Sequence, residues 1–149
     1  MKKLALPALI VILSACEPSN TLENAQNIPD NVQTAFNQRH PGISPTWEVQ
    51  PSYGYEATFS ENGIEYEVEF ASDGTWLETE YEVTDDLQFP PVIFSRVQQK
   101  YPDYTITKRE IELTPQGTFY ELEVERGGTE IELYFNDRAI EVPNSNEDI

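Results

Sequence analysis

A strict alternation of apolar and acidic residues is the feature that most limits the folds open to this chain. Residues 64–70 read Ile-Glu-Tyr-Glu-Val-Glu-Phe, and the same period of two recurs at 55–59, 76–83, 109–113, 119–125 and 130–135. Successive side chains of a strand point to opposite faces of a sheet. The pattern therefore predicts antiparallel strands with one apolar face and one face of glutamates.

Turn signals and two helical stretches complete this pattern. Asn62-Gly63 and Gly127-Gly128 are typical of tight hairpin turns, and Asp73-Gly74 is a further turn signal. The stretches "IPDNVQTAFNQRHPG" and "FPPVIFSRVQQKYPD" begin at Ile28 and Phe89 and match at a constant offset of 61 residues. In each, one proline stands in the first helical turn and a second proline ends the helix.

Such self-similarity indicates one structural unit used twice. After the helices the strands match at an offset of 65, because the second copy has four extra residues near 114–117. We therefore predict an α+β fold of two tandem repeats, residues 28–88 and 89–142. Each repeat is a short helix packed on a four-stranded antiparallel meander. The stretch "FNDRAIEV" lacks an Asp-Gly turn, so we expect a shortened last strand in the second repeat.

The N-terminal residues have the pattern of a bacterial lipoprotein signal. Lys2 and Lys3 precede an apolar run at 4–13, and "LSAC" ends at Cys16, the only cysteine. The run is about half the length that spans a bilayer. We expect a signal peptide at 1–15, a lipidated Cys16 that begins a polar tether at 16–27, and a disordered tail at 143–149. The alternative, a buried free thiol, is disfavoured because Cys16 directly follows the apolar run.

The charge of the chain restricts its partners. Without the signal peptide the chain has 7 basic and 27 acidic residues, a balance of −20. Nucleic acid and anionic lipid surfaces are therefore disfavoured as partners, whereas a basic protein, a cationic peptide or a divalent metal ion stays open. Residues 28–88 have 13 acids and 1 base, against 10 acids and 6 bases in 89–142, so the first repeat should attract cations more strongly.

The repeat resembles a known family. A short helix ending in "HPG" or "YPD", the strand "TWEV", and the stretch "YEATFSENGIEYEVEFASDGTWLE" are similar to the PepSY-like, β-lactamase-inhibitor-protein-like family of bacterial secreted proteins. The resemblance covers about residues 28–142. It implies a helix packed on an antiparallel sheet, repeated in tandem, in an envelope protein without enzymatic activity. No inhibitory residue of the namesake inhibitor maps onto this chain.

Strand parity selects a candidate binding surface on the glutamate face. Large aromatic residues outside a core commonly anchor protein interfaces, and glutamates can steer a basic partner. The candidate anchors and steering residues are Trp76, Phe119, Tyr134, Glu65, Glu67, Glu69, Glu78 and Glu80. The alternatives are a solvated face that only keeps the chain soluble, and a bulge that returns Trp76, or Phe119 beside its own turn, to the core. Trp47 is assigned to the core.

The sequence does not contain a recognisable catalytic constellation. His40 is the only histidine and is interpreted as a partner of a helix C-terminus. We expect no enzyme activity, no cofactor and no metal site. The acidic turns "SENG" and "ASDG" do not have the spacing of an EF-hand. Alternating glutamates on exposed strands are expected to lack the apolar surroundings that raise the pKa of a carboxyl group.

These observations lead to two hypotheses. The first is a lipid-anchored binding module of the bacterial envelope that docks a protein or peptide on its acidic face, in one version as an inhibitor of an envelope hydrolase. The alternative is a divalent-cation-binding or structural envelope lipoprotein without a protein partner. Glu17 after the cysteine resembles outer-membrane sorting signals. The membrane leaflet, the oligomeric state and the partner stay open.

Overall fold

The computed structural model describes residues 27–143. The predicted signal peptide, Cys16, and all but one residue each of the tether and of the tail lie outside the described residues. Neither α-helix within 27–143 has the length and apolar character needed to cross a bilayer.

Two α-helices and eight strands follow one another along the chain, with a short 3-10 helix, η1, before the second α-helix. Their bounds are α1 Asp30–Arg39, β1 Thr46–Gln50, β2 Gly54–Glu61, β3 Ile64–Ala71, β4 Trp76–Glu82, η1 Asp86–Gln88, α2 Pro91–Lys100, β5 Thr105–Thr114, β6 Gly117–Arg126, β7 Thr129–Asn136 and β8 Glu141–Val142. Pro90 and Pro91 begin α2, where a missing N–H leaves no helical hydrogen bond unmade. The last strand has only two residues, as expected from the turn sequence.

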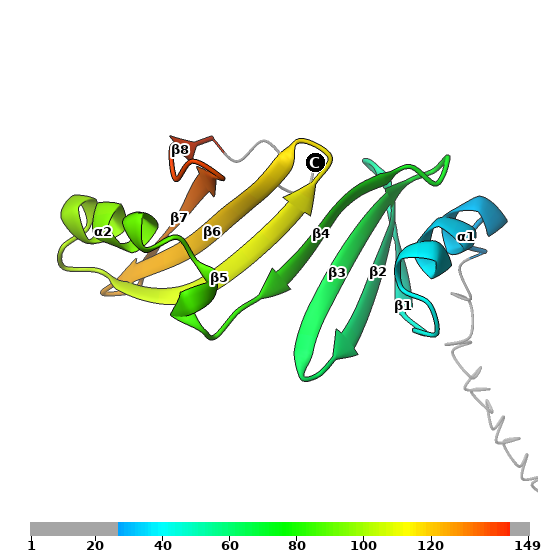
Figure 1. The fold of residues 1–149 in the computed structure, drawn as a ribbon, viewed down its shortest axis with the longest axis horizontal. Coiled ribbons are helices and arrows are strands. Elements are labelled where there is room, and N and C mark those ends of the chain that lie inside the picture. The colour runs from blue at the N-terminus through cyan, green and yellow to red at the C-terminus, as the bar shows by residue number, and fades with distance from the viewer. Residues whose placement is uncertain (1–26, 144–149) are drawn as a thin grey trace, which may run out of the picture.

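All eight strands form one antiparallel sheet in sequence order, β1 to β8 (Figure 1). This confirms the predicted α+β class. The sheet is continuous because β4 pairs with β5, from Thr79 opposite Leu113 to Glu82 opposite Glu110. The two halves of the chain are therefore joined edge to edge by backbone hydrogen bonds, which the sequence pattern did not indicate.

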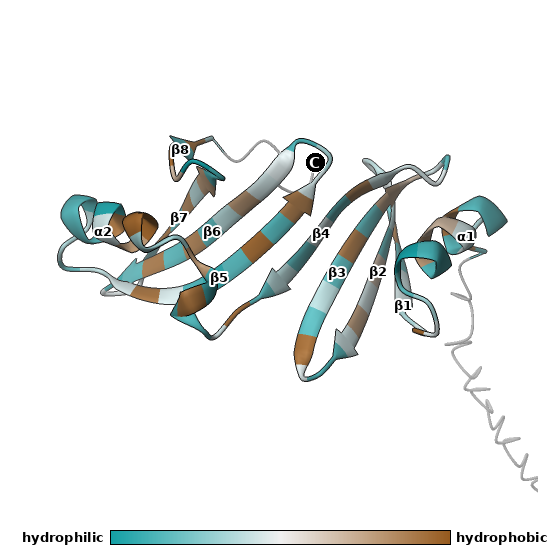
Figure 2. Cartoon of the chain, in the orientation of Figure 1, coloured by the Kyte–Doolittle hydropathy of each residue, from teal (hydrophilic) through white to brown (hydrophobic). Residues whose placement is uncertain are grey.

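Both α-helices pack on the same side of the sheet, one near each end (Figure 1). Val32 and Phe36 of α1 pack on Val68 and Phe70, all fully buried or nearly so. In the second half the corresponding cluster joins Ile93 and Val97 of α2 to Leu122, Val124, Leu133 and Phe135. The strands alternate between hydrophobic and hydrophilic residues as predicted (Figure 2). Trp47 packs against the first cluster, which confirms its assignment to the core.

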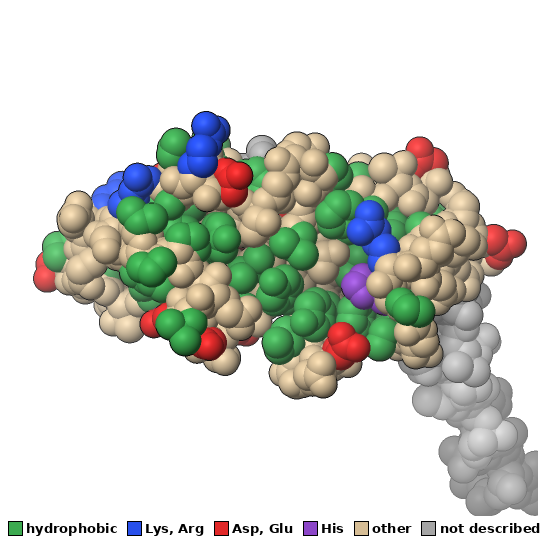
Figure 3. Space-filling model, viewed as in Figure 1, with side chains coloured by type: hydrophobic (Ala, Val, Ile, Leu, Met, Phe, Trp, Pro, Cys, Tyr) green, Lys and Arg blue, Asp and Glu red, His purple; other side chains and the backbone are tan. Residues whose placement is uncertain are grey.

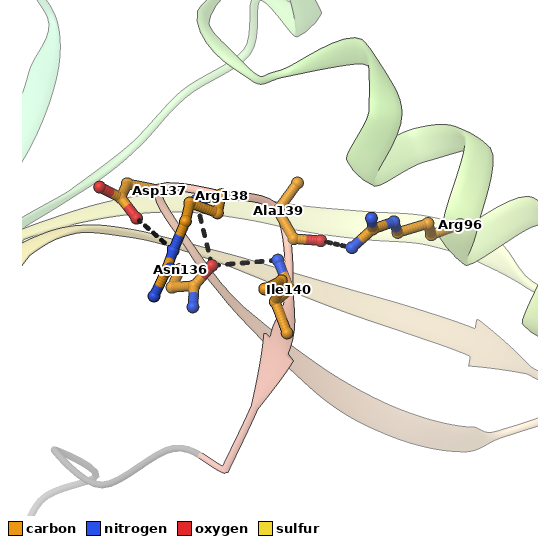
Figure 4. Close-up of polar contacts among 6 residues, drawn as sticks. All are labelled: Arg96, Asn136, Asp137, Arg138, Ala139 and Ile140. Atoms are coloured by element: carbon orange, nitrogen blue, oxygen red, sulfur yellow. Dashed lines mark hydrogen bonds and ion pairs between the residues drawn. The ribbon is translucent and has the colours of Figure 1, made fainter.

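The turn between β7 and β8 forms without an Asp-Gly pair (Figure 4). The side-chain oxygen of Asn136 accepts hydrogen bonds from the backbone N–H groups of Arg138 and Ile140, each at 3.0 Å. Ala139 takes a left-handed conformation with φ +56°. Arg96 of α2 donates a hydrogen bond to the carbonyl of Ala139, so the helix holds this turn against the sheet.

Candidate functional site

One face of the sheet carries glutamates from seven strands and is called here the carboxylate face. Because side chains alternate along a strand, these glutamates lie on the side of the sheet that faces away from the helices. The strand register places them beside one another. They are Glu48, Glu56, Glu65, Glu67, Glu69, Glu78, Glu80, Glu82, Glu110, Glu112, Glu121, Glu123, Glu125, Glu130 and Glu132. The face therefore includes all five steering glutamates selected from the sequence.

The register sets like charges directly across from each other near the β4–β5 junction. Glu80 lies opposite Glu67 on one side and opposite Glu112 on the other, and Glu110 lies between Glu82 and Glu121. Glu78 and Glu110 are 8% exposed and Glu112 is 5% exposed. Like charges directly opposite each other destabilise a strand pair, so this part of the face stores repulsion unless protons or cations neutralise it.

Three carboxyl groups near this junction have raised pKa values and keep their protons to higher pH than an ordinary glutamate. Burial, followed by the charge of Glu112, raises the pKa of Glu78 to about 10. Burial and the charge of Glu110 raise the pKa of Glu80 to about 9, and the same two causes raise the pKa of Glu121 to about 7. The expectation that these glutamates lack surroundings able to raise a pKa was therefore wrong. The reason is that neighbouring strands bury carboxyl groups that the alternation alone leaves in solvent.

A single base interrupts the carboxylate face among the described strand residues. Lys108 of β5 contacts Glu110 at 2.6 Å and lies opposite Glu123. Beside it a cavity of about 140 Å³ opens over β3, β4 and β5, lined by Glu65, Glu67, Glu80, Tyr81, Glu82, Lys108 and Glu110. Its walls are mainly carboxylates, so the cavity favours a cationic group over a neutral or anionic one.

Three carboxyl groups at the junction come close enough to share one cation. Oxygen atoms of Glu80, Glu110 and Glu121 all lie within 4.8 Å of one another. Calcium takes oxygen ligands, commonly carboxylates, so this is the arrangement on the face best suited to it. The acidic turns are less suited. In one of them, Asp73 accepts a hydrogen bond from the N–H of Thr75, which stabilises the turn itself.

Two of the three candidate aromatic anchors lie on the carboxylate face. Phe119 and Tyr134 stack with ring centroids 5.2 Å apart and planes 11° from parallel. Tyr134 is 3% exposed, so its ring supports Phe119 and offers almost no surface of its own. Phe119 is partly exposed and lies opposite Glu112. Of the three candidate anchors, Phe119 is thus the one on this face that a partner can reach.

Trp76 is on the other side of the sheet, which corrects its predicted position beside Glu78 and Glu80. The register shifts between Glu69 and Phe70, so that Phe70 lies opposite Trp76 while Glu69 lies opposite Glu78. This bulge turns Trp76 toward the first hydrophobic cluster. Arg39 of α1 stacks over its ring at 3.9 Å. The alternative reading of the sequence, a return of Trp76 to the core, is confirmed.

A transverse line of apolar side chains crosses the helix side of the sheet and is called here the aromatic row. Phe59, Tyr66, Tyr81, Ile111, Tyr120 and Phe135 lie opposite one another in turn across six strands. Phe59 stacks on Tyr66 at 5.2 Å, and Tyr66 contacts Tyr81 at 5.1 Å. Hydrophobic side chains gather across the middle of this side, between the two helices (Figure 3).

Sequence reasoning missed Glu110, Glu112 and Glu121 as site residues. Their alternation in "REIEL" and "FYELEVE" was the available signal, but only pairing of β4 with β5 brings them beside Glu78 and Glu80. His40 also differs from its interpretation. Its ring lies against Phe36 and Phe59, at 5.1 and 4.9 Å, and burial lowers its pKa, which works against a charged partner for the helix end.

Comparison with known proteins places this geometry in a family. The family described as "Putative beta-lactamase-inhibitor-like, PepSY-like" matches residues 53–140, more than half of the chain. The chain belongs to this family. The resemblance recognised in the sequence is therefore confirmed. No protein with a curated description matches the chain.

Solved structures from Bacteroides species share the fold of this PepSY-like chain. A BLIP-like protein from Bacteroides fragilis is 25% identical, with a TM-score of 0.65 over 76% of this chain and 82% of its own. A DUF2874 family protein from Bacteroides ovatus is 20% identical, with a TM-score of 0.68 over 76% and 84%. A protein from Bacteroides eggerthii described as periplasmic is 19% identical, with a TM-score of 0.68 over 76% and 85%.

Proposed function

We propose that this PepSY-like chain is a lipid-anchored protein of the bacterial envelope that binds a cationic protein or peptide on its carboxylate face. The observation that carries the proposal is the set of paired, buried or partly buried glutamates at the β4–β5 junction, which a cationic group would neutralise. The inhibitor-like family and the periplasmic description of a structural relative support a protein-binding role in the envelope. Neither description names a catalytic activity.

The proposed contact surface centres on the cavity beside Lys108. Glu65, Glu67 and Glu80 line that cavity, and Glu69 and Glu78 continue the same face toward the end of β3 and the start of β4. A lysine or arginine side chain of the partner would enter among these carboxylates, while Phe119 would offer an apolar contact at the edge. Trp76 has no part in this surface, because it lies on the helix side.

The first expected result concerns charge reversal on the face. Glu67→Lys combined with Glu69→Lys should weaken binding of an arginine-rich peptide about tenfold or more, because two attractive contacts become repulsive. Glu130→Lys combined with Glu132→Lys is the matched control, since it makes the same charge change on the same face but on β7. Isothermal titration at low and moderate salt measures both. If both pairs of substitutions weakened binding equally, the attraction would come from the net charge of the chain, and a defined site would be rejected.

Protonation provides a further test of the same surface. A cationic partner at Glu78 or Glu80 would displace protons that these groups hold at neutral pH, because their pKa values are about 10 and about 9. The affinity for a cationic peptide should therefore rise between pH 6 and pH 8, with proton release on binding. Titrations in buffers of different ionisation enthalpy measure that release directly.

A second candidate function is divalent-cation binding at Glu80, Glu110 and Glu121. The close approach of their oxygen atoms favours it. Calcium at about ten times its Kd should stabilise the fold by about 1.4 kcal/mol and raise the melting temperature by several degrees. Glu121→Gln should abolish the rise, whereas Glu130→Gln, on an exposed part of the same face, should keep it. An unchanged melting temperature in millimolar calcium would remove this candidate.

Three finer parts of the proposal rest on the sequence and the family. The helix and four strands of each half support the interpretation of two copies of one unit. The lipobox at Cys16 and the following Glu17 support anchoring, with the outer membrane favoured. Inhibition of an envelope hydrolase rests on the family likeness, and hydrolase assays with a captured partner would separate inhibition from binding alone.

A further inference from the structure

The helix side of the sheet leaves apolar surface uncovered between α1 and α2. The ends of the aromatic row are buried under the helices, with Phe59 7% and Phe135 2% exposed. Tyr66, Tyr81 and Tyr120, in its middle, stay partly exposed, as does Leu113 beside them. Leu87 of η1, in the segment that joins β4 to α2, is 90% exposed. Tyr66, Tyr81 and Tyr120 lie along one line of strand partners, and apolar surface of this kind marks an interaction surface.

The two sides of the sheet differ sharply in charge. The side opposite the helices is the carboxylate face, where Lys108 is the one base among the described strand residues. The helix side carries both signs, with Arg39 over Trp76 and Arg109 paired with Asp86 at 2.7 Å. Few carboxylates are visible on this side (Figure 3). A second copy of this acidic chain can therefore approach the helix side without meeting a field of like charge.

We propose that the helix side is the interface of a homodimer, in which the aromatic row of one chain packs on that of a second copy. A two-fold interface must be complementary to itself, and a patch that is apolar at its centre and carries both charges at its rim meets that requirement. The two carboxylate faces then point away from each other into solvent. This arrangement places the repelling surfaces as far apart as the fold allows, and it leaves the proposed cationic partner a free face.

The exposed middle of the aromatic row would form the centre of such an interface. It runs from Tyr66 on β3 to Tyr120 on β6, a span of about 14 Å at 4.8 Å between neighbouring strands. A stable interface buries about 800 Å² on each partner, so the flanking surfaces of α1 and α2 would complete the contact. Tyr81 lies in the middle of the row, between Tyr66 and Ile111, and so close to the proposed two-fold axis.

Residues 17–149 contain every element that the structure describes and, without Cys16, no cysteine. Sedimentation equilibrium of this protein should show a monomer–dimer equilibrium with a Kd of about 1–100 µM. Leu87→Ser should weaken the dimer at least threefold without lowering the melting temperature, because Leu87 makes little contact within one chain. A monomer at concentrations up to about 1 mM would overturn the proposal.

Single introduced cysteines locate the interface. With a bismaleimide cross-linker of about 10 Å reach, Tyr81→Cys should form a covalently linked dimer, since the two copies of this position face each other across the packed sheets near the axis. Glu67→Cys is the matched control, because it lies on the neighbouring strand with its side chain on the opposite face. Cross-linking of Glu67→Cys to the same extent as Tyr81→Cys would place the contact elsewhere and reject the helix-side interface. These measurements contain no cationic partner, so their outcome is independent of the proposed binding function.

Discussion

Raising the pH from 5 to 9 is expected to destabilise the fold by at least about 2 kcal/mol, which lowers the melting temperature by roughly 5 °C or more. Glu78, Glu80 and Glu121 have folded-state pKa values of about 10, 9 and 7, all above the ordinary value of 4.5. The folded chain therefore binds more protons than the unfolded chain in this range. The stability that these protons give is complete below about pH 4.5 and is lost as the pH rises toward 10.

The neighbours of these groups on every adjoining strand set the size of the effect. Glu69 acts on Glu78 from β3, Glu110, Glu112 and Lys108 act from β5, and Glu132 acts on Glu121 from β7. Among these neighbours only Lys108 is positively charged. It lowers the pKa of Glu80 and Glu121 and so works against the rise caused by the other neighbours.

Amide substitutions isolate the junction from the rest of the face. Glu78→Gln with Glu80→Gln should raise the free energy of unfolding at pH 9 by about 1–2 kcal/mol and flatten the dependence on pH, because two of the repelling groups are removed. Glu48→Gln with Glu130→Gln removes the same number of charges from two exposed positions of the same face that do not lie opposite each other. Urea denaturation at several pH values measures both pairs. A control pair that stabilised as much as the junction pair would assign the effect to net charge.

Gly54→Ala is expected to destabilise the protein by roughly 2–3 kcal/mol. Gly54 begins β2 at φ +144°, a conformation that residues with a side chain rarely adopt. A methyl group there would lie 2.9 Å from the backbone nitrogen of Ser72 and closer still to the carbonyl oxygen of Phe70. Backbone atoms of β3 cannot move aside without disturbing the pairing of Gly54 with Ala71.

Gly117 is a natural control for this substitution. It begins β6 at φ +146°, nearly the same conformation, but an added methyl group would meet nothing within 4 Å. Gly117→Ala should therefore show the conformational effect alone, about 1 kcal/mol. Chemical denaturation of the two variants separates strain from steric overlap. Equal losses of stability would mean that β3 yields to the methyl group at little cost.

Local patterns predicted the elements of this fold well. The period of two along "IEYEVEF" places Val68 and Phe70 in the core, and the prolines at 29 and 90 precede the two helices. Asn62 and Gly63 adopt the positive φ angles that their turn sequence suggests. Each of these inferences needs only neighbouring residues, because side-chain direction in a strand and backbone freedom in a turn are local properties.

The candidate site depended on a β-bulge and on a pairing between distant strands, and local sequence patterns predict neither. One extra residue after the Asp73-Gly74 turn moves Trp76 to the opposite face, and alternation cannot locate such a bulge. The pairing of β4 with β5 joins residues from the two halves and buries carboxyl groups that alternation along either strand alone assigns to solvent. The whole chain decides which strand edges of the two halves pair. The raised pKa values of Glu78, Glu80 and Glu121 therefore followed only from the assembled sheet.

The sequential order of the strands has a consequence for how the chain folds. Each strand pairs with the strands next to it in sequence, so every pairing except that of β4 with β5 closes a short loop. Only the passage from β4 to β5 spans a helix, and the remaining neighbours can meet as hairpins as soon as both strands exist. Proteins rich in such local contacts fold faster than all-β proteins of similar size that depend on distant pairings. A chain that emerges N-terminus first can therefore add one strand at a time to a growing sheet, without waiting for its C-terminal residues.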